Sequence, residues 1–331
     1  MNRNQLVVII FPIIFLLSCK KISSTDKSIL NKTNLNLASS SLSTQQVSLT
    51  ATSKKFLFDA TKSETAGNAD WVIDEDSNIP QRIPTPLQSN VTASTSESFW
   101  TGALSSWGIA LVKLGNVVET LPSGKSITYG NTSNVQDLAN YNVFVVDEPN
   151  IRFTAAEKIA ILNFVKNGGG LFMISDHTAS DRNNDGWDSP AIWNDLMTTN
   201  SVQSNPFGFK IDLTNISETS TNVTTISNPI TNGSQGVVNT IKFNNGATST
   251  LTSGSAAKPL LWKTTSAQGL TNVLAAYSTY GTGRITLVCD SSPADDGTGA
   301  VGNTLYPGWT DVNGNHSKLH LNASLWLAKL Q

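Results

Sequence analysis

The sequence contains few charged residues and even fewer histidines. Charged residues make up 14% of the 331-residue chain, with 22 basic and 24 acidic side chains and only three histidines. Proteins that bind nucleic acid through broad phosphate neutralisation need a strongly basic surface, which this composition lacks. We therefore predict that nucleic acid is not a partner of this protein.

Cysteine is nearly absent as well, because the chain has only Cys19 and Cys289. Two cysteines exclude the disulfide framework that supports many small secreted domains. Cys289 follows the largely apolar run Ile285–Val288, so we expect a buried and chemically inert thiol there. If Cys19 is modified, no internal disulfide remains possible.

The leader contains the one long apolar run near the start of the chain, and it is too short to cross a membrane. This run extends over about a dozen residues, Leu6–Leu17, whereas a spanning helix needs roughly 20. Arg3 precedes it, and Leu16-Leu17-Ser18-Cys19 follows the pattern of a bulky residue, a small residue and cysteine. That pattern resembles the lipobox of bacterial lipoproteins, in which the thiol is lipidated and the chain is cut just before it.

The resemblance implies a signal peptide over residues 1–18 and a lipid on Cys19. The protein is then a membrane-anchored lipoprotein of the cell envelope, at the outer membrane or cell surface. The alternative is an ordinary secretory signal with a chance cysteine. Residues 19–53 are rich in Ser, Thr, Asn and Lys and lack aromatic side chains. They bury too little apolar surface to offset the entropy of ordering, so we predict a disordered tether.

From residue 54 to 331 the pattern is that of a folded α/β domain. Apolar strands are expected at 55–60, 116–121, 141–147, 171–175 and 283–289, and helices over 103–114, 154–166 and 318–330. Thr154 and Glu157 form a capping-box pattern at the start of the second helix. Continuous apolar strands that alternate with amphipathic helices indicate a mostly parallel sheet with helices on both faces. Residues 200–258, rich in Asn, Thr and Gly, predict a β-rich insertion.

Three successive segments resemble the class I glutamine amidotransferase-like superfamily, in particular its trehalose-utilisation (ThuA-like) and related branches. They are NVFVVDEPN at 142–150, FTAAEKIAILNFVKNGGG at 153–170 and LFMISDH at 171–177. The resemblance covers roughly residues 54–330 and implies a flavodoxin-like fold. True amidotransferases carry a nucleophilic cysteine at the turn after the central strand. Here that turn holds Asp176 and His177, so hydrolysis of glutamine by a thiolate is not expected.

Polar side chains follow the predicted strands where a ligand crevice would lie. Asp59, Asp176, His177 and Asp290 stand at strand ends, and ligands of open α/β sheets bind beyond the carboxyl ends of the strands. His316 and His320 are four residues apart at the start of the last helix, a spacing that lets two imidazoles bind one metal. We expect His177, His316 and Asp290 to hold a water, with Asp176 orienting an imidazole or acting as base. Zinc or a harder divalent ion, or a metal-free Asp–His pair, would supply the chemistry.

A second metal pattern lies in the loop DRNNDGWD at 181–188. Asp181, Asn183 and Asp185 alternate and Gly186 follows, which resembles the start of an EF-hand calcium loop, with Asp188 as a further acid. Ile192 occupies the twelfth position, where an acid is usual. Asn, Asp and Gly also make polar turns without a metal, and both interpretations stay open.

The sequence therefore predicts a cell-envelope hydrolase-like protein with a metal-assisted Asp/His site and a small-molecule or glycan substrate. Trp71, Trp187 and Trp309 lie in polar segments, where exposed aromatic rings would stack on sugars. They would otherwise anchor their loops by partial burial. The second hypothesis is a non-catalytic surface lipoprotein that binds a glycan or a protein partner, with structural calcium. The oligomeric state stays open.

Overall fold

A computed structural model describes residues 53–76 and 79–331 of the protein. Cys19, the predicted leader at 1–18 and the predicted tether, apart from its last residue, lie outside the described residues. Within the described part, no helix has both the length and the apolar character needed to cross a membrane.

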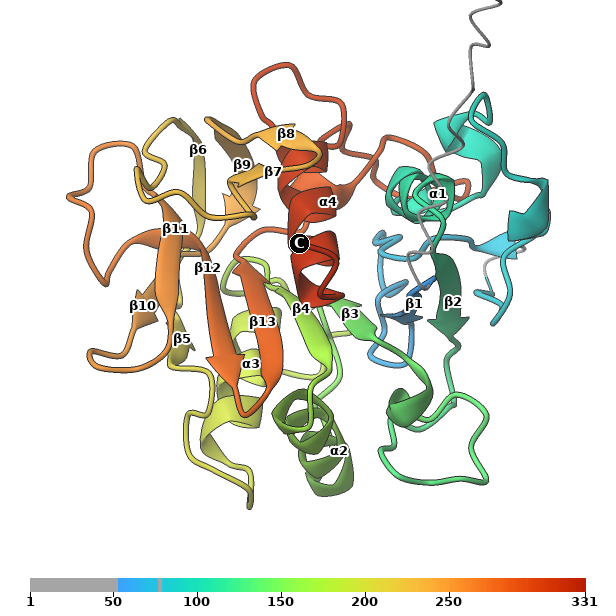
Figure 1. Cartoon of the computed structure of the whole chain (residues 1–331), viewed down its shortest axis with the longest axis horizontal. Helices are drawn as coiled ribbons and strands as arrows, with labels where there is room; N and C mark the ends of the chain where they lie inside the picture. Colours follow the sequence, from blue (N-terminus) through green and yellow to red (C-terminus); the bar gives the residue numbers. More distant parts are fainter. Residues whose placement is uncertain (1–52, 77–78) are drawn as a thin grey trace, which may run out of the picture. The chain divides into compact units, whose positions relative to one another are not determined.

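The centre of the fold is a nine-stranded sheet with a parallel half and an antiparallel half (Figure 1). The strand order is β2-β1-β3-β4-β13-β12-β10-β5, and β11 also pairs with β12. The parallel strands are β1 (Lys55–Asp59), β2 (Val117–Leu121), β3 (Val143–Asp147), β4 (Gly170–Ile174) and β13 (Gly283–Val288). These five match the five strands expected from apolar runs, and the predicted α/β fold class is confirmed.

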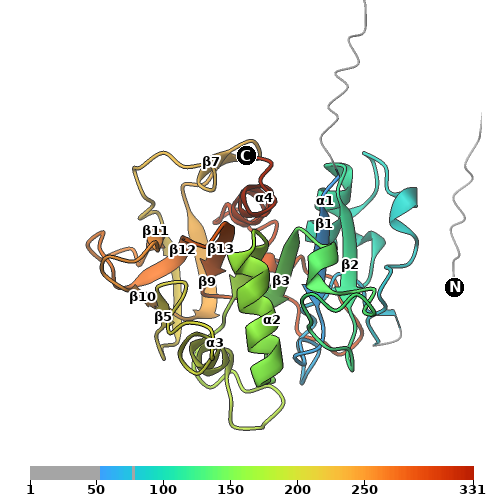
Figure 2. The same ribbon diagram turned by 60° about the horizontal axis from the view of Figure 1, so that its bottom comes forward.

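Helices cover both faces of the parallel strands, as their apolar character requires. Every residue of β3 and β4 is buried, because parallel strands in the middle of a sheet have no solvent-facing side. Figure 2 shows one pair of helices on one face and a second pair on the other. The first pair is α1 (Ser105–Lys113) and α4 (His316–Leu327), and the second is α2 (Ala155–Lys166) and α3 (Ser189–Thr198).

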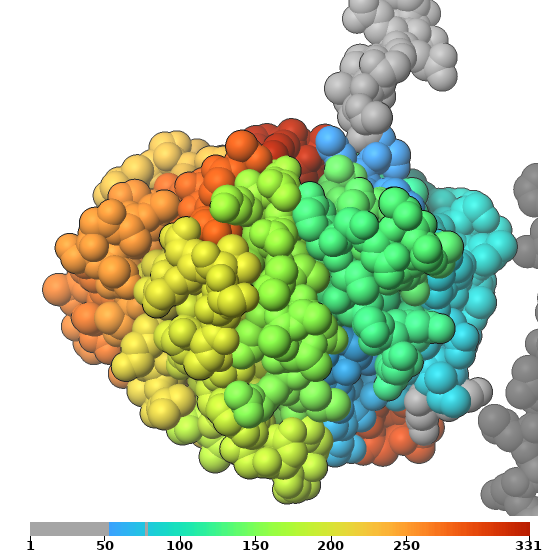
Figure 3. Space-filling model, turned by 90° about the horizontal axis from the view of Figure 1, so that it is seen from below, coloured from blue at the N-terminus to red at the C-terminus, as the bar shows by residue number. Residues whose placement is uncertain are grey.

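Helix α2 begins with the predicted capping box. The Thr154 hydroxyl accepts from the Glu157 amide, and the Glu157 carboxylate accepts from the Thr154 amide at 2.8 Å. Ile161 is buried in the core, whereas Ile159 is 37% exposed. The chain leaves the helix at Gly168, whose φ of +114° suits glycine. The face seen in Figure 3 is formed largely by the green-to-yellow part of the chain, which contains α2 and α3.

The predicted β-rich insertion is partly a continuation of the main sheet. The antiparallel half contains three strands from this region and one long strand that the apolar pattern did not predict. The other strands of the region form two small sheets. The antiparallel half comprises β5 (Phe209–Ile211), β10 (Ser249–Leu251), β11 (Lys258–Trp262) and β12 (Val273–Tyr280). The small sheets pair β6 (Ile216–Ser220) with β9 (Ile241–Gly246), and β7 (Asn232–Gly233) with β8 (Gly236–Val237). Short 3-10 helices occupy Gln88–Asn90, Glu97–Phe99, Leu138–Asn140 and Ser292–Ala294.

Candidate functional site

The carboxyl ends of β3, β4 and β13 bring several acidic side chains together. Asp147, Ile174 and Val288 are in register across these three parallel strands. The residues that follow each strand therefore reach the same edge of the sheet, where Glu148, Asp176 and Asp290 are all buried. We call these three residues, together with Asp147 and Asp295, the acidic cluster.

This arrangement places Asp147 and Glu148 in unfavourable surroundings. Asp147 is 2% exposed, and neither of its carboxylate oxygens has a hydrogen-bond partner within the described residues. Burial, followed by the negative charges of Glu148 and Asp290, raises the pKa of Asp147 well above its usual range. Glu148 adopts a φ of +44°, a left-handed conformation that is unfavourable for a side-chain-bearing residue. Strain of this kind concentrates at functional sites.

Arg182 is the cation that faces the acidic cluster. Its guanidinium donates to the Glu148 carboxylate through Nε, and Nη2 lies 3.6 Å from Asp176 Oδ2. A third nitrogen, Nη1, donates to Asn68 Oδ1 at 3.0 Å. Ser291 donates its hydroxyl to Glu148 Oε2 at 2.7 Å, so Glu148 is the best satisfied of these acids. One guanidinium thus bridges the ends of β3 and β4.

Asp176 is set up to hold a proton. Desolvation raises its pKa well above the usual range, and the nearby charges of Glu148 and Asp290 raise it further. Arg182 acts in the opposite direction, but its closest contacts are with Glu148 rather than with Asp176. A buried carboxyl of this kind is neutral at pH values where an exposed aspartate is ionised.

His177 lies beside Asp176 and reaches the surface. Its side chain is 20% exposed, and Nε2 is 3.7 Å from Asp176 Oδ2. Nδ1 lies 2.6 Å from the carbonyl oxygen of Thr178. A carbonyl oxygen can only accept, so this shorter contact favours a proton on Nδ1 and a lone pair on Nε2, whereas the Asn215 side-chain nitrogen, 3.1 Å from the same Nδ1, would donate to it. The structure therefore pairs a carboxyl that retains its proton with a nitrogen that can accept one.

Asp290 supports this pair from within the protein. Its two oxygens accept the backbone amides of Asn244 at 2.6 Å and of Ser292 at 2.9 Å, and the residue is fully buried. Desolvation raises its pKa to about 8. The sequence predicts that Asp290 holds a water, whereas in the structure its oxygens accept from the backbone of β9 and of the 3-10 helix Ser292–Ala294.

His316 and His320 are packed away from this pair. Nδ1 of His316 contacts the Gly308 carbonyl oxygen at 2.6 Å, and Nε2 accepts the Lys242 amide at 2.8 Å, so neither ring nitrogen is available to a metal. His320 is fully buried and stacks on Phe172 at 5.5 Å. Burial lowers its pKa to about 3. The two histidines do share the start of α4 as predicted, but they serve packing.

The 181–188 loop directs its oxygens to its own backbone. Asp181 accepts the amides of Asp185 and Gly186 at 3.0 and 2.7 Å, and Asp185 accepts that of Trp187 at 2.9 Å. Asn183 likewise accepts from Asp185, and Asp188 accepts the Ala191 amide as the N-cap of α3. Within residues 53–76 and 79–331, no group of three or more His, Cys, Asp or Glu side chains has a geometry that could hold a metal. The residues predicted to bind zinc are therefore not gathered into such a group in the described part of the chain, whereas calcium binding by the 181–188 loop stays a prediction.

Two of the three tryptophans in polar segments are buried. Trp71 is 2% exposed and Trp309 is 4% exposed, which leaves neither ring open to a sugar. Trp187 is half-buried, and the Arg152 guanidinium lies 3.9 Å from its ring centre. All three therefore act as anchors of their loops.

Two remaining predictions concern residues outside the acidic cluster. Asp59 is the last residue of β1, which lies two strands away from β4, and its charged neighbours are Lys62 and Glu64. It belongs to the same edge of the sheet but not to the Asp176 group. Cys289 is fully buried, and burial raises the pKa of its thiol far above the usual range, so the predicted inert thiol is confirmed.

Five residues at the site were not predicted from the sequence, namely Asp147, Glu148, Arg182, Asp295 and Tyr306. Glu148 directly follows Asp147, an acid at a strand end, and this position could have indicated that Glu148 belongs to the site. Arg182 meets Glu148 across 34 residues, and nothing in the local pattern indicates that contact. Tyr306 lies close enough to Arg182 and Asp176 for their charges to affect the pKa of its phenol, although burial is the main cause of its rise.

No protein-family model and no curated protein matches this chain. Solved structures with similarity to it include the N-terminal domain of mmIFT52, with a TM-score of 0.48 and 13% identity over 82% of this chain and 97% of that one. A cytoplasmic protein from Salmonella typhimurium has a TM-score of 0.45 and 13% identity over 83% and 98%. A ThuA-like protein from Parabacteroides merdae has a TM-score of 0.44 and 15% identity over 84% and 91%. The assignment of the α/β architecture comes from the strand order above.

Proposed function

We propose that this protein is a hydrolase-like protein of the cell envelope, with Asp176 and His177 as its acid and base. The observation that carries the proposal is their pairing at 3.7 Å beyond the end of β4, with the carboxyl buried and the imidazole partly exposed. Two groups whose surroundings favour opposite protonation roles are what general acid–base catalysis requires.

The chemistry follows from the protonation states. A water that donates a hydrogen bond to His177 Nε2 transfers its proton there while its oxygen attacks an electrophilic carbon of the substrate. Asp176 gives its proton to the leaving group as the bond to that group breaks. Arg182 pairs with Glu148, and the raised pKa values of Asp147, Asp176 and Asp290 keep these carboxyls largely neutral, so this edge offers no strong net charge to an ionic substrate. A neutral glycan or another small uncharged molecule is therefore the proposed substrate class.

The mechanism is tested by a hydrolysis screen with chromogenic esters, amides and glycosides. We expect wild-type activity to fall at least ~100-fold in both Asp176→Asn and His177→Ala, the usual scale for loss of a general acid or base. Asp185→Asn serves as the matched control, because its exposed carboxylate makes only local contacts in the 181–188 loop. The control should retain activity, and EDTA should have no effect.

Activity should decline as pH rises, because the acid form of Asp176 is lost above its raised pKa. Wild-type rates no higher than those of the two variants across the whole panel would refute the proposal. Loss of activity in Asp185→Asn together with sensitivity to EDTA would instead indicate a metal held by the 181–188 loop.

The proposed location rests on the leader. Leu16-Leu17-Ser18-Cys19 resembles a lipobox, and residues 19–53 have the composition of a tether. A lipid on Cys19 would hold the α/β domain at a membrane surface, outside the cytoplasm.

A further inference from the structure

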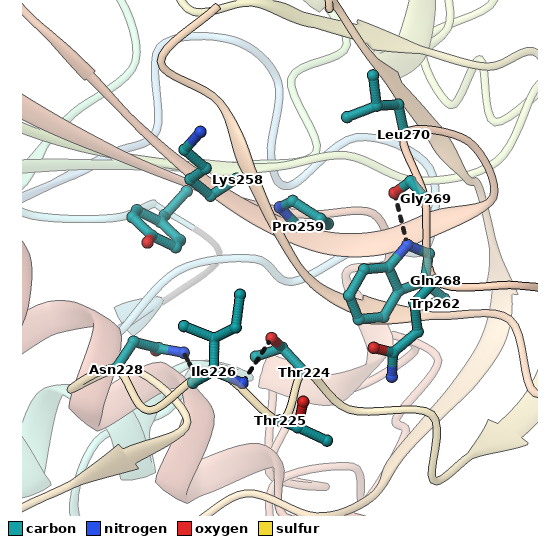
Figure 4. Close-up of a pocket in the computed structure, with 11 residues that line it drawn as sticks. Thr224, Thr225, Ile226, Asn228, Lys258, Pro259, Trp262, Gln268, Gly269 and Leu270 are labelled. Atoms are coloured by element: carbon teal, nitrogen blue, oxygen red, sulfur yellow. Dashed lines mark hydrogen bonds between the residues drawn. The ribbon is translucent and has the colours of Figure 1, made fainter.

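A pocket of about 500 Å³ opens in the antiparallel half of the sheet (Figure 4). It shares no lining residue with the acidic cluster. Its walls come from the loop after β6, from β11 with its neighbour on β12, and from the loop that joins those two strands. Its volume lies in the range of small-molecule sites.

Hydrogen bonds hold the walls in place. The Trp262 indole N–H donates to the Gly269 carbonyl at 2.8 Å and ties β11 to the following loop. On the opposite wall, Asn228 Nδ2 donates to the Ile226 carbonyl at 3.0 Å, and the Ile226 amide donates to the Thr224 hydroxyl at 3.2 Å (Figure 4). A ligand would therefore not have to order these segments when it binds.

The middle of the pocket is apolar. Ile226 is 75% exposed and Leu270 is 39% exposed, although both are large aliphatic side chains. Pro259 lies with Ile226 between Lys258 and Trp262 in Figure 4. Trp262 is 3% exposed and its ring nitrogen donates to Gly269, so this side chain supports the wall and adds no free polar group to it. Exposed aliphatic groups gathered around a concavity favour an apolar ligand body.

One end of the pocket is cationic. Lys258 and Tyr277 are cross-strand partners on β11 and β12, so their side chains leave the sheet on the same face. Lys258 is exposed, and no carboxylate within the described residues forms an ion pair with it. Tyr277 lines the pocket on the same face of the sheet. An acidic group placed here would gain a charge-assisted hydrogen bond.

We propose that this pocket binds a small amphipathic anion. The apolar body of the ligand lies against Ile226, Pro259 and Leu270, and its acidic group accepts from Lys258 Nζ. This binding site is separate from the Asp176–His177 pair and does not depend on the proposed hydrolysis.

The test compares two fluorescent probes on the full chain, purified identically for all variants and read against matched buffer. 1-Anilinonaphthalene-8-sulfonate carries a negative charge, and N-phenyl-1-naphthylamine is its uncharged counterpart. Lys258→Gln should weaken binding of the anionic probe by about tenfold and that of the neutral probe by less than about twofold. Lys125→Gln removes an exposed lysine outside the pocket, so it should change the binding of neither probe.

Ile226→Asn tests whether the apolar body of the ligand binds against this side chain. Ile226 is exposed, so it can be replaced without disturbing the core. This substitution should weaken binding of both probes, while the circular dichroism spectrum stays that of the wild type. Equal affinity of the anionic probe for Lys258→Gln and Lys125→Gln would overturn the proposal. So would unchanged binding of both probes to Ile226→Asn, or the absence of saturable binding to the wild type.

Discussion

Several carboxyl groups of this protein have raised pKa values, because the fold buries them. Asp59 Oδ2 and Glu64 Oε1 are both buried without a hydrogen-bond partner in the described structure, unless a proton is shared between the two carboxyls. Burial raises the pKa of Asp59 to about 6, and burial together with the charge of Asp59 raises that of Glu64 well above its usual range. The folded state therefore binds protons that the unfolded chain releases.

Asp59→Asn tests this linkage. A carboxyl whose pKa is raised on folding contributes stability below its unfolded pKa of about 4, and that contribution is lost as pH rises through about 6. The wild type should therefore lose free energy of unfolding between pH 4.5 and 8, and Asp59→Asn should lose on the order of 2 kcal/mol less over that interval. Urea denaturation at both pH values measures the difference. An equal loss of free energy of unfolding between the two pH values in both proteins would contradict the shared-proton interpretation.

Helix ends show how local sequence and tertiary contacts reinforce each other. The capping box of α2 was expected from Thr154 and Glu157 alone. In the structure the Glu157 carboxylate also accepts from the buried Lys62 ammonium at 2.7 Å, which ties the start of α2 to the segment after β1. Helix α3 has comparable signals in Asp188 and Pro190, but the calcium-like spacing of the 181–188 loop led us to interpret Asp188 as a possible metal ligand. An aspartate before a proline serves as an N-cap as readily as a ligand.

Thr154→Ala should lower the free energy of unfolding by about 1 kcal/mol, because the Glu157 amide loses its acceptor. Thr265→Ala is the matched control, since this exposed hydroxyl makes no hydrogen bond in the described structure. Urea denaturation at one pH measures both. A change of the same size in the two variants would show that the cap contributes nothing specific.

For the molecule as a whole, the two halves of the sheet present different chemistry. The parallel half ends in the acidic cluster, because parallel strands bring their carboxyl ends to one edge. The antiparallel half carries the pocket with Lys258 at one end. Both lie in the part of the chain that the predicted lipid on Cys19 would hold at a membrane.

Cys19→Ser should move the protein from the membrane fraction to the soluble fraction, because the acyl chains supply about 0.8 kcal/mol for each buried CH₂ group. Fractionation of cells and immunoblotting measure the shift. Cys289→Ser is the control and should stay with membranes, because this buried thiol is not part of the leader. Retention of Cys19→Ser in the membrane fraction would contradict the lipid anchor.

Local pattern was enough to place most of the parallel strands, three of the helices and the Asp176–His177 pair at a strand end. Strand and helix periods are properties of neighbouring residues, so they can be read without knowing the fold. The sequence also predicted a buried Cys289, because this residue follows an apolar run, and the structure confirms that burial.

Only the tertiary structure decided which polar groups act together. His316 has a metal-like spacing from His320, yet its Nε2 accepts from Lys242, 74 residues away. Arg182 lies in a calcium-like loop, yet it pairs with Glu148 from another strand end. A side chain's protonation and availability depend on burial and on partners that arrive from distant segments, and neither is encoded in the spacing of residues along the chain.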